Sequence, residues 1–272
     1  MKNMKTALSA EYVESVQPTD SFNIHYHEYY EFYFFLDGEA DYHVNGKIYH
    51  LVPNSIILLS PYVLHGVHVK SEKPYKRYFI HFDINCIRDT YRPVIQSLFP
   101  ESKFYTMGEV YFPDIQDKAI IHFCNALLNA SKKHNSIGED FTPLFLESLL
   151  AQFTLTCSSM KRSKEYHISN KAVQDVIRYI NSHLNEKISL TLLSELFFLN
   201  KDHLNRLFHK VMGTTVQKYI SHQRILYAEQ LLSRGVLASE AAVASGFGDY
   251  SSFYRAYKNV TGHSPKEQKG ET

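Results

Sequence analysis

The chain has 272 residues and a mass of 31.6 kDa, which is long for one domain and enough for two domains that each bury a core. Its hydrophobic content of 44% and charged content of 21% are typical of a soluble globular protein. No stretch reaches the roughly eighteen apolar residues of a membrane span, and the N-terminus has no signal-peptide core. We therefore expect a cytoplasmic protein with no membrane partner.

The cysteines and the charge distribution further limit the class of protein to which the chain can belong. The three cysteines are scattered, which argues against a disulfide framework and against a cysteine-rich zinc site. The net charge of +1 hides a split, because residues 1–165 hold 16 Lys+Arg against 19 Asp+Glu and residues 166–272 hold 13 against 9. A basic C-terminal part is consistent with a polyanionic partner.

The N-terminal part has the pattern of a β domain. From about residue 22 to residue 83, runs rich in Tyr, Phe, Ile and Val are broken every eight to twelve residues by turn signals such as "LDGE" and "VPNS". Asn45-Gly46 between two alternating segments is a strong hairpin signal. These spacings predict an all-β sandwich or barrel.

After Pro113 the apolar period becomes helical. Two helices are expected at about 113–157, and the excess of apolar surface on them predicts a homodimer. The apolar positions of these stripes are Ile120, Phe123, Leu127, Leu128, Leu144, Phe145, Leu149 and Phe153. A Ser/Lys-rich piece then indicates a linker at 158–168, and the remaining chain is all helical. We accordingly expect domains at 10–157 and 169–272.

The C-terminal part contains an ungapped repeat. "HLNRLFHKVMG" (His203 to Gly213) matches "SFYRAYKNVTG" (Ser252 to Gly262) at an offset of 49 residues, with Arg206 aligned on Arg255. Two copies are fewer than a solenoid needs. The pattern of each copy, together with the residues before it, predicts a short helix, a turn and a second helix. The repeat therefore predicts two helix-turn-helix units joined by one long helix.

Each second helix has a predicted cap and a polar outer face. Asn200 and Asp249 are the expected caps, and Ser189 is expected to cap the helix before the first turn, where Leu193 and Leu196 should face inward. Arg, Asn and Lys on a rigid helix suit guanine, adenine and phosphate respectively. The alternative to DNA binding is an ordinary helical domain whose amphipathic helices expose their polar faces to water.

The residues from Ile188 to Gly235, followed by "GFGDYSSFYRAYKNVTGHSPKE", resemble the paired helix-turn-helix domain of AraC/XylS transcription regulators. That resemblance implies two readers of successive major-groove segments in double-stranded DNA, and RNA polymerase as a further partner. The second unit departs from the family at Ala238, Ala241 and Gln268-Lys269, which predicts a thinner core for it. The expected DNA-binding residues are Lys201, Asp202, His203, Asn205, Arg206, Lys210, Tyr250, Ser251, Ser252, Arg255 and Lys258.

The β-rich part carries "HYHEYYEFYFFLDG" and, later, "PNSIILLSPYVLH". His25, His27 and Glu31 are expected on one strand face with His65 on a later strand, and this arrangement resembles the two motifs of the cupin fold, which converge on a divalent metal. The motifs lack their usual Gly near Thr19 and have Asn54-Ser55 in place of Gly-Asp. The expected ligand-binding residues are His25, His27, Glu31, Tyr33, Tyr42, His65, Tyr78 and His81.

Three readings of that lining stay open: a metal site at His25, His27, Glu31 and His65, a metal-free pocket for a small molecule such as a sugar, and hydrogen-bonded residues without a ligand. No obligatory cofactor and no catalytic residue is expected. The fold class predicted is α+β multidomain, with an N-terminal cupin-like β-barrel flanked by helices and an all-α C-terminal domain. The expected function is a sequence-specific transcription regulator, an activator or a repressor, controlled by a small molecule such as a sugar. The alternative is a metal-dependent cupin enzyme of the dioxygenase or isomerase type.

Overall fold

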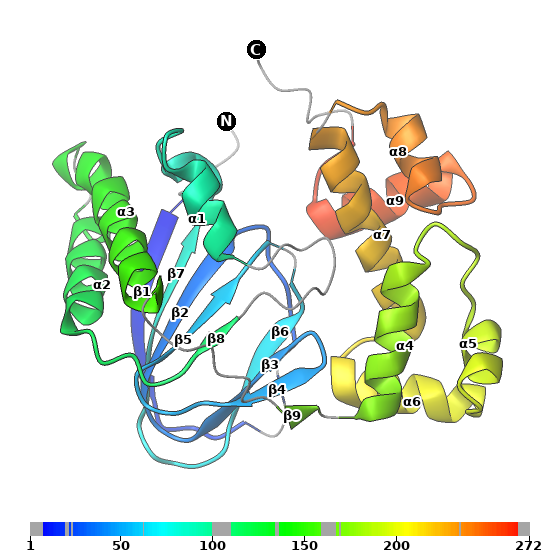
Figure 1. The fold of residues 1–272 in the computed structure, drawn as a ribbon, viewed down its shortest axis with the longest axis horizontal. Coiled ribbons are helices and arrows are strands. Elements are labelled where there is room, and N and C mark those ends of the chain that lie inside the picture. Colours follow the sequence, from blue (N-terminus) through cyan, green and yellow to red (C-terminus); the bar gives the residue numbers. More distant parts are fainter. Residues whose placement is uncertain are drawn as a thin grey trace. The chain divides into compact units, whose positions relative to one another are not determined.

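The computed structural model describes residues 8–19, 22, 24–61, 63–99, 110–133, 136–158, 167–168, 170–233 and 235–265. The chain divides into a β-rich unit that ends at His167 and a helical unit that starts at Ile168. This division confirms the α+β multidomain class (Figure 1). Within the described residues, no helix combines the length and the apolarity needed to cross a membrane.

The larger sheet of the first unit is antiparallel, with strand order β1-β7-β2-β5-β8. Its aromatic and β-branched residues alternate between two buried faces, as expected of a sheet covered on both sides. Its strands are β1 (Leu8–Ser15), β7 (Tyr75–Phe82), β2 (Tyr30–Asp37), β5 (Ser55–Leu59) and β8 (Tyr111–Phe112).

The smaller sheet has the order β6-β3-β4-β9 and closes a second core against the larger sheet. The predicted hairpin is confirmed: Asn45 and Gly46 have φ angles of 49° and 83° between β3 and β4, which is the left-handed geometry of such turns. The strands are β3 (Ala40–Val44), β4 (Lys47–His50), β6 (His65–Val69) and β9 (His167–Ile168).

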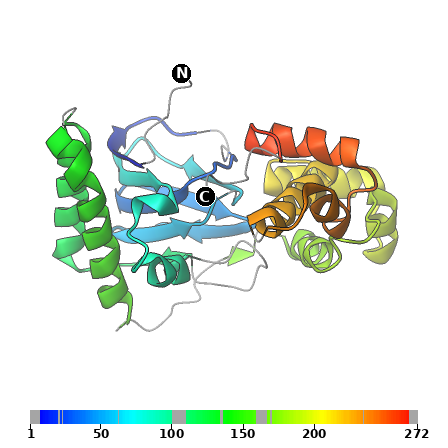
Figure 2. The same cartoon turned by 90° about the horizontal axis from the view of Figure 1, so that it is seen from above.

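Helices cover the other face of the larger sheet, where α2 and α3 lie side by side (Figures 1 and 2). Leu127 of α2 and Phe153 of α3 are fully buried in this core. Asp117 ties the two helices together, because it caps α2 and accepts hydrogen bonds from Gln152 and Thr156 of α3. The helices are a 3-10 turn (Ile84–Cys86), α1 (Arg92–Leu98), α2 (Lys118–Ser131) and α3 (Ser136–Ser158).

The second unit holds six helices among its described residues. Its predicted caps are confirmed at Ser189, Asn200 and Asp249, each of which accepts a backbone N–H from the first turn of its helix. Leu193 is buried as expected, whereas Leu196 is 45% exposed, so its inward placement was wrong. The helices are α4 (Lys171–Ser182), α5 (Leu190–Leu196), α6 (Lys201–Met212), α7 (Val216–Ser233), α8 (Ala238–Ala244) and α9 (Tyr250–Thr261).

The predicted joining helix is α7, which packs on both pairs of helices. Tyr219 of α7 meets Phe208 of α6 with ring centroids 5.4 Å apart. Further along, Ile225 and Ala228 pack with Phe253 of α9. The small residue Ala241 of α8 is fully buried in that second core. One helix therefore holds α5-α6 and α8-α9 on a common support.

Candidate functional site

Glu31 is a buried carboxylate inside the β-rich unit. Along β2, Phe32 and Phe34 pack toward the helices, while Tyr33 and Phe35 belong to the core between the two sheets. Strand alternation therefore places Glu31 on the interior side, where it is only 4% exposed. A buried charge requires partners, and three histidines supply them.

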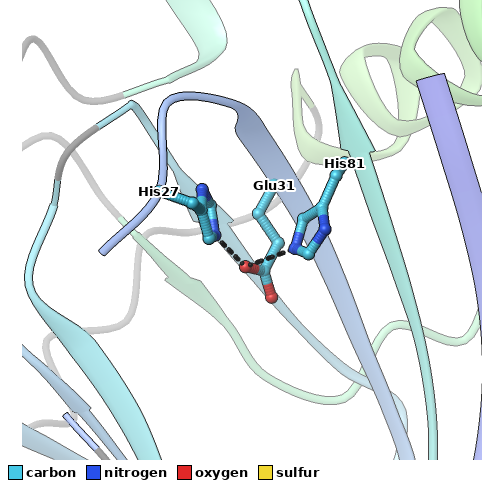
Figure 3. A group of neighbouring side chains, drawn as sticks. All are labelled: His27, Glu31 and His81. Atoms are coloured by element: carbon cyan, nitrogen blue, oxygen red, sulfur yellow. Dashed lines mark hydrogen bonds and ion pairs between the residues drawn. The ribbon is translucent and has the colours of Figure 1, made fainter. Parts of the chain in front are cut away.

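The three imidazoles converge on one oxygen of this carboxylate, Oε2. The Nε2 atoms lie 2.7 Å away for His27, 3.1 Å for His81 and 3.4 Å for His65. Figure 3 shows His27 and His81 on either side of Glu31. One nitrogen from each of these two histidines and one oxygen of Glu31 all lie within 4.8 Å of one another, a spacing that can hold a metal ion.

These histidines come from three separate segments. His81 is on β7 directly opposite Glu31 in the strand register, His65 begins β6, and His27 precedes β2. The expectation that His25 and His27 share a strand face with Glu31 is wrong, because β2 begins only at Tyr30. His25 forms an isolated backbone bridge with His65, and its exposed side chain has its ring 4.4 Å from that of His65.

Burial and hydrogen bonding act on Glu31 in opposite directions. Burial alone would raise the pKa of this carboxyl, because it penalises the charged form. The close approach of the His27, His65 and His81 imidazoles outweighs burial and holds the pKa of Glu31 well below its usual range. The carboxylate is therefore ionised, and three imidazole nitrogens face it.

Hydroxyl groups and one guanidinium complete this interior. Tyr42 donates to Glu31 Oε1 at 3.5 Å, and burial followed by that negative charge raises the pKa of Tyr42 well above its usual value. The hydroxyls of Tyr33 and Tyr75 are hydrogen-bonded to each other. The Arg77 guanidinium lies 4.4 Å from the centre of the Tyr75 ring, and its buried Nη1 has no hydrogen-bond partner among the described residues.

The structure brings most of the predicted pocket residues together and separates one. Tyr78 faces the helices, where its hydroxyl donates to Asn125 Oδ1 at 2.6 Å, so its placement in the pocket lining was wrong. Arg77, its neighbour, was not predicted. It lies on the same face of β7 as Tyr75, Phe79 and His81, and this spacing of two residues is the sequence signal that identifies it.

The polar faces of α6 and α9 form the second candidate site. Arg206 and Arg255 are exposed at equivalent positions, while Leu204 and Phe253 below them are fully buried. The Arg255 Nε donates to the Ser251 carbonyl at 3.4 Å. The other predicted DNA-binding residues that are exposed are Lys201, Asp202, His203, Lys210, Tyr250, Ser251 and Lys258, while Ser252 is half-buried.

Asn205 makes a contact within the protein that the sequence analysis does not predict. Its Oδ1 accepts the backbone N–H of Val216 at 3.3 Å, so it caps the start of α7 from the preceding helix. The residue at the equivalent position of the second copy is Tyr254, which is 36% exposed. Tyr254 and the exposed His209 of α6 were absent from the predicted set, although both lie on the polar faces.

Two capped helix-turn-helix units on one central helix, joined in sequence to a β-rich domain with a polar interior, define a two-domain DNA-binding regulator. The AraC-like ligand binding domain matches residues 8–154, and a helix-turn-helix domain matches residues 193–270. The chain belongs to the AraC family of transcription regulators, whose N-terminal domain binds ligands. It is a regulator and not an enzyme, which sets the cupin-enzyme alternative aside.

Relatives with similar sequences carry matching descriptions. The "Uncharacterized HTH-type transcriptional regulator YfiF" of Bacillus subtilis is 25% identical over 248 residues, 89% of this chain and 77% of the relative. The "Probable transcriptional regulator LumQ" of Photobacterium leiognathi is 35% identical over 127 residues, 44% of this chain and 51% of the relative. The chain spans 20% of the length of a matching Staphylococcus aureus regulator, which is 25% identical over 146 residues.

Among solved structures, ToxT from Vibrio cholerae is similar to this chain over nearly all of its length. It is 16% identical, the match covers 97% of each chain, and the TM-score is 0.36.

Proposed function

We propose that α6 and α9 read two successive major-groove segments and that an effector in the β-rich domain controls this binding. The observation that carries the DNA part is the pair Arg206 and Arg255. Both are exposed, one repeat apart, on helices whose caps and buried stripes hold them rigid. Arginine makes bidentate contacts with guanine, and adjacent major-groove faces repeat about every 34 Å along DNA.

The test is to select duplexes from a random pool with the intact protein and then measure affinities for Arg206→Ala and Arg255→Ala. Each lost bidentate contact should cost about 1–3 kcal/mol, roughly a tenfold to hundredfold loss, with the fold unchanged. Arg178→Ala is the matched control, because Arg178 is an exposed arginine of α4, outside both reading helices. If both test variants bind as tightly as the control, the helix assignment is wrong.

We further propose that the effector is an oxygen-rich small molecule, a sugar being the class that the lining suits best. Arg77 offers a buried guanidinium N–H that finds no partner within the described ranges, and the hydroxyls of Tyr33, Tyr42 and Tyr75 lie on the same interior side. A ligand at 100 times its dissociation constant adds about 2.7 kcal/mol to stability. A thermal-shift screen of sugars, with Arg77→Met as the comparison, tests this; a shift that is equal in both chains would contradict it.

The homodimer is proposed on a surface that shares only Leu144 with the predicted stripes. Leu127, Leu149 and Phe153 are fully buried within the single chain, so these stripes are mostly consumed by the monomer. What remains on α3 is a seam at three- and four-residue steps, the spacing of a coiled-coil contact. This α3 seam consists of Phe141, Leu144, Ser148, Ala151 and Leu155.

A second copy of this chain is the partner proposed for the α3 seam. Phe141, Leu144 and Leu155 are 50%, 42% and 67% exposed, and such a patch is costly to leave in water. Leu144→Glu and Leu155→Glu should shift light scattering toward the monomer. Val94→Glu is the control, because Val94 is an equally exposed apolar residue on α1. Contact with RNA polymerase, activation and action in the cytoplasm stay predictions that follow from the DNA target.

A further inference from the structure

Backbone carbonyls fix the protonated nitrogen of two histidines around Glu31. His27 Nδ1 lies 3.0 Å from the carbonyl oxygen of Tyr29, and His65 Nδ1 lies 2.8 Å from that of Val63. A carbonyl oxygen only accepts hydrogen bonds, so each Nδ1 must carry the hydrogen and donate it. In the neutral imidazole, the remaining nitrogen Nε2 then presents a lone pair.

Both lone pairs face the same carboxylate oxygen. His27 Nε2 is 2.7 Å and His65 Nε2 is 3.4 Å from Glu31 Oε2. His65 is 1% exposed, and its Nε2 has no hydrogen-bond partner in the part of the chain that the structure describes. Lone pairs directed at a negative oxygen repel one another, so the buried cluster needs positive charge between or upon these atoms.

Protons could supply that charge only at a cost. An imidazolium at His27 would make a short charge-assisted bond to Glu31. A second imidazolium at His65 would bury another cation in a nearly inaccessible place, with a distance to oxygen too long for a strong bond. A single divalent cation satisfies both lone pairs and the carboxylate without any added proton.

We propose that the β-rich domain binds one divalent transition-metal ion through His27, His65, His81 and Glu31. Imidazole nitrogens with one carboxylate select zinc, iron, cobalt or nickel over magnesium and calcium, which prefer oxygen ligands. Bonds of about 2.1 Å in a tetrahedral site correspond to ligand separations of roughly 3.4 Å. The Nε2 atoms of His65 and His81 lie 3.4 and 3.1 Å from Glu31 Oε2, and that of His27, at 2.7 Å, would move outward on binding. The carbonyls of Tyr29 and Val63 are the outer partners that orient such ligands.

The ligand set differs from the one expected from sequence. His25 is exposed, whereas His81 belongs with His27 and Glu31 to the group with closely spaced ligand atoms. The metal site itself stands independently of DNA binding. Only its use as a control on DNA affinity rests on the proposed function.

The experiment uses the full-length chain, stripped with a chelator and then titrated with Co²⁺ or Zn²⁺, with Mg²⁺ as the comparison. We expect one equivalent per chain by elemental analysis, a visible Co²⁺ spectrum and a raised melting temperature, with no effect of Mg²⁺. Glu31→Gln and His81→Ala should each weaken uptake by more than about tenfold, because even outer-sphere changes cost that much. His50→Ala is the matched control, since His50 pairs with Asp41 at 2.8 Å on the surface.

Several outcomes overturn the site. These are no stoichiometric uptake by the parent, or equal uptake by parent, Glu31→Gln and His81→Ala; the first result would leave a cluster held by protons alone. His81→Gln replaces His81→Ala if the latter fails to fold by circular dichroism. Arg206→Ala should take up metal like the parent, so a loss of DNA binding and a loss of metal binding are read separately.

Discussion

Gly246 and Leu184 approach so closely that no side chain fits between them: a Cβ on Gly246 would lie 2.2 Å from the Leu184 carbonyl oxygen. Gly246 also has a φ of +87°, and it lies in the turn between α8 and α9. The same carbonyl accepts a hydrogen bond from Arg224 Nε of α7 at 2.9 Å. The loop after α4 is thus held against the second helix-turn-helix unit at one point.

Replacing Gly246 by Ala should destabilise the helical unit by about 3 kcal/mol, because backbone strain and a clash with a backbone atom add together. Gly235→Ala is the control: Gly235 has a similar φ of +81° but nothing within 4 Å of an added Cβ. That variant should lose only about 1 kcal/mol. Denaturant unfolding measures both, and equal losses would show that the close approach to Leu184 has no energetic weight.

The second prediction concerns Asn205 as a cap. Asn205→Ala removes the acceptor for the Val216 N–H and should cost about 1 kcal/mol of stability, whereas Asn205→Asp keeps an acceptor and should cost little. If Asn205 instead reads a base, Asn205→Ala should leave stability unchanged and alter the preference at one base pair. Thermal unfolding together with selection from a random duplex pool separates the two roles.

The helix caps and the tight hairpin could be predicted from the sequence, because each depends only on residues close by in the chain. Asn200, Asp249 and the Asn45-Gly46 hairpin all follow that rule. The contact between Asn205 and Val216 is not local in this sense. Val216 lies beyond the turn that ends α6, and nothing in the helix pattern indicates the contact.

The pocket residues whose predicted positions are wrong are those for which strand alternation was misapplied. Tyr78 and His81 are three positions apart on one strand, so they point to opposite faces, and the sequence alone could have excluded one of them. His25 and His27 precede β2, so the alternation of a strand does not predict where their side chains point. Convergence on Glu31 from β6, β7 and the segment before β2 is a property of the closed fold, which no local pattern records.

The third prediction is a pH dependence carried by Asp117. Hydrogen bonds from Thr156 and Gln152, and then the Ala119 N–H, lower the pKa of this carboxyl. Because the folded pKa lies below the unfolded one, the stabilisation is present above the unfolded pKa and is lost as pH falls through the folded pKa. Asp117→Asn should therefore lower the melting temperature at pH 7, by an amount equivalent to about 1 kcal/mol, and the gap to the parent should shrink below about pH 4. A gap that stays constant from pH 7 to pH 3 would contradict this role.

The last prediction concerns the base preference of α9, the second helix proposed to enter the major groove. Tyr250 and Tyr254 lie one turn apart on α9, each is 36% exposed, and their ring centroids are 6.4 Å apart. Apolar contact with the C5-methyl group is how side chains recognise thymine in the major groove. The DNA half bound by α9 should therefore be enriched in thymine, unlike the half bound by the polar face of α6.

Deoxyuridine tests this directly, because it differs from thymidine only by that methyl group. Replacing thymines in the α9 half of a selected duplex should weaken binding of the parent by about 1 kcal/mol, roughly fivefold. The same replacement should have little effect on Tyr254→Ala, since the contacting ring is already gone, and replacements in the α6 half serve as the control. Equal sensitivity of the parent and Tyr254→Ala would mean that the tyrosine does not read the methyl group, whatever its contribution to overall affinity.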